Sequence, residues 1–83
     1  MTYSVIWLPE AMTAYRQLRA ADPHGAKRIA KAVAALAVDP RPAESSTLGG
    51  TNFRRIRLDG YRVLYEFADD MVRVMHVGRV IGR

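Results

Sequence analysis

Residues 53–67 read FRRIRLDGYRVLYEF, which is two strand-like runs joined by Asp59-Gly60. This dipeptide is a strong signal for a two-residue hairpin, because glycine tolerates the positive φ that a type I′ turn requires. The stretch therefore predicts two antiparallel strands whose register follows by counting outward from the turn. The predicted pairs are Leu58 with Tyr61, Arg57 with Arg62, Ile56 with Val63, and Arg55 with Leu64.

The two faces of this hairpin differ in chemistry, because successive side chains of a strand point to opposite faces. One face is apolar and predicts contact with the core: Ile56, Leu58, Tyr61 and Val63. The other face is basic: Arg55, Arg57 and Arg62. Two arginines directly opposite each other cost on the order of 0.2–1 kcal/mol. We therefore expect this face to meet an anionic partner.

The residues before the hairpin predict one strand and two helices. The β-branched and aromatic residues of 2–8 are typical of a strand, and Pro9-Glu10 is typical of a helix start that runs to about Leu18. Asp22 fits an N-cap, with Pro23 at the first position of a second helix. That helix is expected to end near Asp39, since proline disfavours helix in the residue before it.

A loop and a last strand complete the chain. Residues 40–52, PRPAESSTLGGTN, carry two prolines and two glycines and predict a loop, with Leu48 as its anchor to the core. Asp69-Asp70 predicts a second turn. Counting across it places Glu66 opposite Arg73 as an ion pair. The same count places these residues together on the core face: Tyr65, Phe67, Val72 and Val74.

Together these elements predict an α+β fold in the order β-α-α-β-β-β. We expect one domain over residues 1–83, with a mostly antiparallel four-stranded sheet. Both helices should pack on one face of the sheet and leave the arginines on the other. The pattern does not fix the place of the first strand in the sheet.

Composition narrows the function classes. The 83 residues contain 13 Lys and Arg against 8 Asp and Glu, a net charge of +5, which favours a polyanion or an acidic protein partner. The chain has no cysteine, which excludes disulfides, thiolate zinc sites and a cysteine nucleophile. No metal-ligand cluster, phosphate-binding glycine loop or cofactor motif is present in the sequence. Without an apolar run near the roughly 20 residues of a membrane span or a signal peptide, we expect a cytoplasmic protein.

The whole pattern resembles the RelE/ParE superfamily of bacterial toxins from type II toxin–antitoxin pairs. The resemblance extends over essentially the entire chain, and its most specific part is Gly60-Tyr61-Arg62 followed by Leu64-Tyr65. The other matching pieces are a strand followed by Pro-Glu-Ala at 9–11, DPRP at 39–42, LGG at 48–50, and VGR at 77–79.

For the RelE branch, the resemblance implies an endoribonuclease that cuts messenger RNA, often on the ribosome, and thereby inhibits translation. It needs no metal: the 2′-hydroxyl attacks the adjacent phosphate and leaves a 2′,3′-cyclic phosphate. A cognate antitoxin is the implied protein partner, and operator DNA is reached only through that antitoxin.

By position, the resemblance assigns catalytic roles to arginines of the hairpin and of the basic cluster after the last strand: Arg55, Arg57, Arg62 and Arg79. The residues expected to bind RNA are Arg55, Arg57, Arg62, Arg73 and Arg83. Guanidinium deprotonates reluctantly, so these arginines suit phosphate binding and charge stabilisation better than base catalysis.

Two alternatives stay open. Val80 stands where the family commonly has a second arginine, and no tyrosine follows it before Arg83. These departures leave room for a ParE-like DNA gyrase inhibitor, or for a degenerate toxin that only binds its antitoxin.

His76 has the chemistry of a general base, but counting from the Asp69-Asp70 turn places it on the core face beside Val74. A bulge would be needed to turn it outward.

Overall fold

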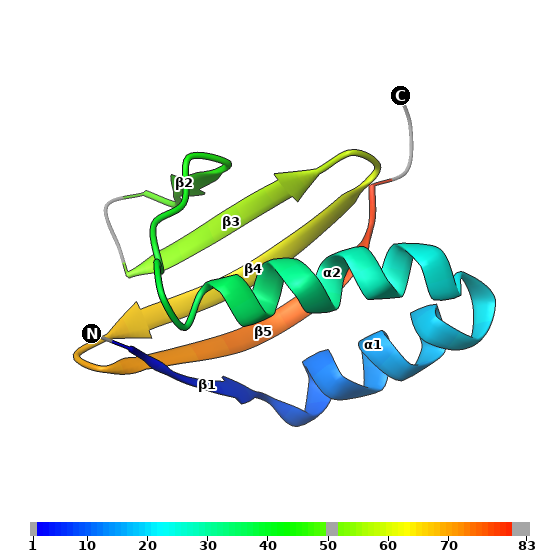
Figure 1. Cartoon of the computed structure of the whole chain (residues 1–83), viewed down its shortest axis with the longest axis horizontal. Coiled ribbons are helices and arrows are strands. Elements are labelled where there is room, and N and C mark those ends of the chain that lie inside the picture. Colours follow the sequence, from blue (N-terminus) through cyan, green and yellow to red (C-terminus); the bar gives the residue numbers. More distant parts are fainter. Residues whose placement is uncertain (1, 50–51, 81–83) are drawn as a thin grey trace.

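The computed structural model describes residues 2–49 and 52–80, which form two helices and a five-stranded sheet (Figure 1). The strand order is β1-β5-β4-β3-β2, in which β1 runs parallel to β5 and every other pair is antiparallel. The predicted α+β fold is confirmed, with one strand more than expected. The elements are β1 (Ser4–Trp7), α1 (Pro9–Ala21), α2 (Pro23–Ala35), β2 (Ser45–Thr47), β3 (Phe53–Leu58), β4 (Tyr61–Ala68) and β5 (Met71–Arg79).

The β3–β4 hairpin has the predicted turn and register. Gly60 has a φ of 82°, the left-handed conformation for which glycine is suited. Arg57 lies opposite Arg62, and Ile56 lies opposite Val63. Local turn chemistry and alternation were therefore sufficient to place the arginines on one face.

The turn between β4 and β5 is also confirmed at Asp69-Asp70, where Asp69 has a φ of 57°. Glu66 lies opposite Arg73, and their side chains form an ion pair with an Nη1–Oε1 distance of 3.1 Å. Tyr65 and Phe67 lie opposite Val74 and Val72, as predicted.

The expectation of an irregular loop over residues 40–52 was incomplete, because β2 lies within it and pairs with β3. β3 would otherwise present an unpaired edge of backbone groups, and a short extended segment beside it satisfies them. The guanidinium of Arg54 adds two hydrogen bonds to Oγ of Ser45, at 3.1 Å from Nε and 2.8 Å from Nη2. Three small polar residues carry too little pattern to signal a strand on their own.

The helix boundaries follow local chemistry. Asp22 caps α2 as predicted, since its Oδ1 accepts a hydrogen bond from the Gly25 amide at 3.0 Å. α2 ends at Ala35 rather than near Asp39. Beyond it the chain continues in tighter i→i+3 turns, with the amide of Leu36 donating to the carbonyl of Val33 at 3.0 Å.

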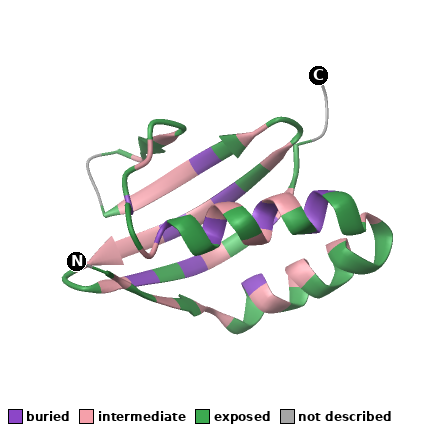
Figure 2. Cartoon of the chain, viewed as in Figure 1, coloured by how far each residue is buried: buried purple, intermediate pink, exposed green. Residues whose placement is uncertain are grey.

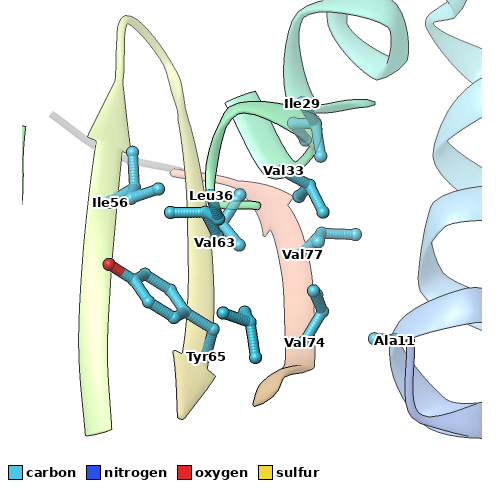
Figure 3. Close-up of a cluster of buried hydrophobic side chains, with 10 residues drawn as sticks. Ala11, Ile29, Val33, Leu36, Ile56, Val63, Tyr65, Val74 and Val77 are labelled. Atoms are coloured by element: carbon cyan, nitrogen blue, oxygen red, sulfur yellow. The ribbon is translucent and has the colours of Figure 1, made fainter. Parts of the chain in front are cut away.

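The core lies between the helices and one face of the sheet (Figure 3). Figure 2 shows buried and exposed positions alternating along α2, and its buried residues Ile29 and Val33 belong to the core cluster. The largest buried side chain is Tyr65, whose hydroxyl donates to the Pro40 carbonyl at 2.5 Å and so holds the segment after α2 against the sheet. The buried cluster comprises Ala11, Ile29, Val33, Leu36, Ile56, Val63, Tyr65, Val72, Val74 and Val77.

The arrangement of the helices leaves the second face of the sheet uncovered. α2 crosses the sheet over β4 and β5, while α1 lies beside β5 past the end of β1 (Figure 1). The outward residues of β3 and β4 therefore form an open surface, bordered by α1 on one side and by the segment around β2 on the other.

Candidate functional site

The uncovered face carries Arg55 and Arg57 from β3 and Arg62 from β4, and we call it the arginine face. Arg57 and Arg62 are exposed and lie directly opposite each other, as predicted. Within the described residues, none of the three guanidinium groups has an ion pair or hydrogen bond, and Nε of Arg55 is buried without a partner. Three like charges therefore converge without an internal counter-charge.

A hollow of about 240 Å³ lies on this face and is called the arginine hollow. Leu48 was predicted to anchor its loop to the core, but the structure places it on the opposite side of the sheet, where it lines this hollow. The cause is β2, which holds the loop along the outer edge of β3. The residues that line the arginine hollow are Leu48, Arg55, Arg62, Leu64 and His76.

His76 also lies on the arginine face, contrary to the expectation that it points to the core. The register of β4 and β5 shifts between Leu64 and Tyr65, so that Tyr65 pairs with Val74 while Leu64 pairs with His76. Met75 is the extra residue of this bulge, and it reverses the alternation beyond it. Val77 is consequently buried, whereas His76 is exposed.

A second hollow of about 620 Å³ adjoins the first and is called the α1 hollow. α1 contributes three polar side chains to its lining, Glu10, Thr13 and Gln17. Its sheet side is lined by Met75 and by the two residues shared with the arginine hollow, Leu64 and His76. His76 therefore stands between a basic hollow and a larger hollow with hydrogen-bonding side chains.

The structure separates Arg79 from the other predicted catalytic arginines. Arg79 pairs with Tyr61 across β4 and β5, which places it on the helix side of the sheet. Its Nη2 lies 3.4 Å from Oδ2 of Asp22, in an ion pair. The same bulge that turns His76 outward turns Arg79 away from the arginine face.

Arg79 belongs to a small polar group, which we call the Asp22 cluster: Asp22, Gly25, Tyr61 and Arg79. The hydroxyl of Tyr61 donates a hydrogen bond to Oδ2 of Asp22. This bond, together with the bond from the Gly25 amide, holds the pKa of the Asp22 carboxyl below its usual range, and Arg79 adds to the effect. The hydrogen bond to Asp22 in turn raises the pKa of the Tyr61 hydroxyl. The cluster joins the start of α2 to the start of β4 and the end of β5.

The remaining predicted RNA-binding residues are less central. Arg73 lies at the far end of the uncovered face and is paired with Glu66. Arg83 lies outside the described residues. Arg55, Arg57 and Arg62 are thus the predicted arginines that the structure brings together.

Sequence reasoning missed His76, although the sequence of β5 contains a signal. Its buried valines are Val72, Val74 and Val77, so the spacing changes from two residues to three. A step of three within an alternating strand indicates one inserted residue. The polar residues of α1 in the second hollow gave no comparable signal.

The described part of the chain shows neither a metal-binding cluster nor a membrane-spanning helix. No group of three or more His, Cys, Asp or Glu side chains there is arranged to hold a metal ion. Neither helix is long and apolar enough to cross a membrane.

Comparison with known proteins identifies relatives of the chain. The profile of the ParE toxin family, described as toxins of the type II toxin–antitoxin system parDE, matches residues 5–80. No curated protein sequence matches the chain at the threshold for significance.

Solved structures share the fold over nearly the whole chain. The Mycobacterium tuberculosis RelBE2 toxin–antitoxin complex contains a chain of 19% identity with a TM-score of 0.81, which covers 96% of this chain and 100% of that one. A mutant of the E. coli toxin RelE in the free state gives 24% identity, a TM-score of 0.79, and coverage of 95% and 84%. The archaeal RelE–RelB complex from Pyrococcus horikoshii gives 26% identity, a TM-score of 0.75, and coverage of 95% and 96%.

Proposed function

Because the chain belongs to the ParE toxin family and is a type II toxin of the RelE/ParE superfamily, we propose that it is a messenger RNA endoribonuclease that a cognate antitoxin neutralises. The arginine face carries this proposal. Arg55, Arg57 and Arg62 converge on an open surface, and no counter-charge from residues 2–49 or 52–80 pairs with them, which is the arrangement expected of a phosphate-binding site. Guanidinium groups bind phosphate oxygens with paired hydrogen bonds.

The proposed reaction is attack by a ribose 2′-hydroxyl on the adjacent phosphate, which releases a 5′-hydroxyl and leaves a 2′,3′-cyclic phosphate. Negative charge accumulates on the phosphoryl oxygens as the transition state forms. Arg55 and Arg62 line the same hollow, and with Arg57 they supply fixed positive charge where that negative charge develops. The arginines do not supply a base, because guanidinium remains protonated at any physiological pH.

The unpaired charges also explain why the toxin needs a partner. An acidic antitoxin segment that contacts the arginine face would neutralise it and block access of RNA to it. Two of the similar structures are toxin–antitoxin complexes. The short β2 leaves one edge of the sheet near the arginine face, where an extended antitoxin segment could pair by adding a strand.

The test is induced expression followed by mapping of the 5′ ends of cellular messages. We expect wild type to produce new ends phased to codons, because the proposed activity acts on translated messages. Arg62→Ala should lower their yield by about 100-fold, the scale of losing one charge-stabilising group. Arg16→Ala is the matched control, since Arg16 is exposed on α1 and lies outside both hollows. Co-expressed antitoxin should suppress the new ends.

Two results of this experiment would contradict the proposal. Unchanged cleavage by Arg62→Ala at equal expression would show that the arginine face does not carry the activity. Growth arrest without new ends would show that the toxin acts without cleaving messages.

The match to the ParE toxin profile supports a second candidate, inhibition of DNA gyrase. An assay of DNA supercoiling by gyrase in the presence of the purified toxin separates the two. Loss of supercoiling without RNA cleavage would favour gyrase inhibition. Normal supercoiling together with no RNA cleavage would favour a degenerate toxin that only binds its antitoxin.

A further inference from the structure

The arginine hollow contains one residue whose side-chain chemistry the arginines lack. Of the side chains that line it in the described structure, only that of His76 belongs to a type that changes charge between pH 5 and 8. We propose that His76 takes the proton from the attacking 2′-hydroxyl. The inference rests on the proposed ribonuclease function and supplies the base that this function lacks.

The backbone determines that His76 is available for this role. The bulge at Met75 places His76 opposite Leu64 and on the same face as Arg55 and Arg62. Without the inserted residue, alternation would direct His76 into the core and the next outward position would be Val77. The bulge therefore exchanges an apolar side chain for an imidazole at this point of the uncovered face.

The imidazole of His76 lies over Gly78, the residue opposite Arg62. A Cβ atom built at Gly78 would lie 3.4 Å from Nε2 of His76, so the ring extends along β5 over the glycine. Gly78 is the residue paired with Arg62 on β4. Nε2 of His76 thus lies above the position opposite an arginine that we assign to phosphate binding, and no side chain at residue 78 intervenes.

The two hollows indicate how a nucleotide would lie against this histidine. His76 lines both hollows. With a phosphate held by Arg55 and Arg62, we place the nucleoside on the 5′ side of that phosphate over the α1 hollow, where Glu10, Thr13 and Gln17 offer hydrogen-bonding groups. The 2′-hydroxyl of that nucleoside, which is the attacking group, then falls at the boundary between the hollows beside His76.

In the proposed step, Nε2 of neutral His76 accepts the proton of the 2′-hydroxyl. The electron pair of that O–H bond forms the bond from the 2′-oxygen to phosphorus. The bond from phosphorus to the 5′-oxygen breaks, and its electron pair leaves with that oxygen, which takes a proton from water. The products are a 2′,3′-cyclic phosphate and a 5′-hydroxyl, and His76 later loses its proton to solvent.

The test uses the two histidines of the chain as a matched pair. Toxin purified from its antitoxin is mixed with ribosomes that carry a defined message, and the single-turnover cleavage rate is measured from pH 5 to pH 9 for wild type, His76→Gln and His24→Gln. His24 is exposed near the start of α2 and lines neither hollow. The charged groups that face His76, namely Glu10, Arg55 and Arg62, are the same in all three proteins.

We expect His76→Gln to cleave more slowly by about 100-fold or more, the usual contribution of a positioned base. The rise of the wild-type rate between pH 5 and 8 should disappear in this variant, while binding to the programmed ribosome stays within about twofold of wild type, since the arginines are intact. His24→Gln should keep both the rate and its rise with pH.

Contradictory outcomes separate the inference from the proposed function. Wild-type rate and pH profile in His76→Gln would overturn the role of His76 and leave the ribonuclease function standing. Loss of binding in proportion to loss of cleavage would also overturn it, since His76 would then be a binding residue. A wild-type protein that cleaves no message would overturn both.

Discussion

The arginines on the two sides of the sheet differ in their surroundings. On the helix side, Arg79 is paired with Asp22, and Arg28 donates a hydrogen bond from Nη1 to the Asp59 carbonyl at 3.3 Å while its guanidinium carbon lies 5.8 Å from the centre of the Tyr61 ring. On the arginine face, Arg57 and Arg62 lie opposite each other without such partners in the described structure.

This difference distinguishes arginines that stabilise the fold from arginines that are available to bind a ligand. An arginine with a nearby carboxylate, carbonyl or ring gains from contacts within its own chain. Arginines that face each other across two strands lose free energy through repulsion, on the order of 0.2–1 kcal/mol per pair. Positions that carry such a cost in the isolated protein are expected to recover it when an anion binds.

The largest stability effect should come from the helix side, at Gly25. A Cβ atom at this position would overlap the ring and hydroxyl of Tyr61. Gly25→Ala should therefore displace Tyr61 and lower the free energy of unfolding by about 1–3 kcal/mol, the usual cost of overpacking. Urea denaturation measures the loss.

Tyr61→Leu provides the control for this prediction. In that background Gly25→Ala should cost much less, because the ring that it displaces is absent. An equal cost in both backgrounds would show that the effect does not pass through the Asp22 cluster. RNA cleavage per folded molecule should be unchanged by Gly25→Ala, which would sharpen the distinction between the two sides of the sheet.

A smaller effect on the same side should depend on pH. The Tyr61 hydroxyl and then the Gly25 amide lower the pKa of Asp22 below its ordinary value of 3.8. A carboxyl with a lowered pKa in the folded state stabilises the fold above its unfolded pKa, and that stabilisation is lost as the pH falls through the folded value. Wild type should therefore exceed Asp22→Asn in Tm above pH 3.8, and the difference should shrink at lower pH. A difference that stays constant from about pH 7 down to about pH 2 would contradict this.

The smallest effect is expected at the exposed pair of Glu66 and Arg73, whose side chains are 26% and 45% exposed. Arg73→Ala should change the free energy of unfolding by at most about 0.5 kcal/mol, because solvent screens exposed ion pairs. Thermal melts at low and high salt measure it. A loss well above about 1 kcal/mol, the upper end for exposed pairs, would mean that a paired arginine on the uncovered face also has a structural role.

Local signals were sufficient to predict much of this molecule. The hairpin, the second turn and the cap of α2 each depend on a few adjacent residues, such as Asp59-Gly60 and Asp22-Pro23. Strand alternation, counted from the hairpin turn, then places three arginines on one face. These features could be predicted because turn chemistry and strand period act over short distances.

The features that sequence reasoning missed depend on contacts between distant segments. β2 exists because the edge of β3 is available to it, and its own residues carry little strand signal. The bulge at Met75 exchanges the faces of every later residue of β5. One inserted residue thus accounts for the exposure of His76, which counting had directed to the core, and for the position of Arg79 beside Asp22.

The central claim is that the unpaired arginines, and not the paired ones, carry the activity. The most direct measurement compares the 5′ ends of messages after expression of wild type, Arg62→Ala and Arg79→Ala at equal levels of folded protein. The account predicts that the codon-phased ends fall by about 100-fold with Arg62→Ala and persist with Arg79→Ala, because Arg79 lies on the helix side in an ion pair with Asp22. Ends that persist with Arg62→Ala and vanish with Arg79→Ala would contradict it.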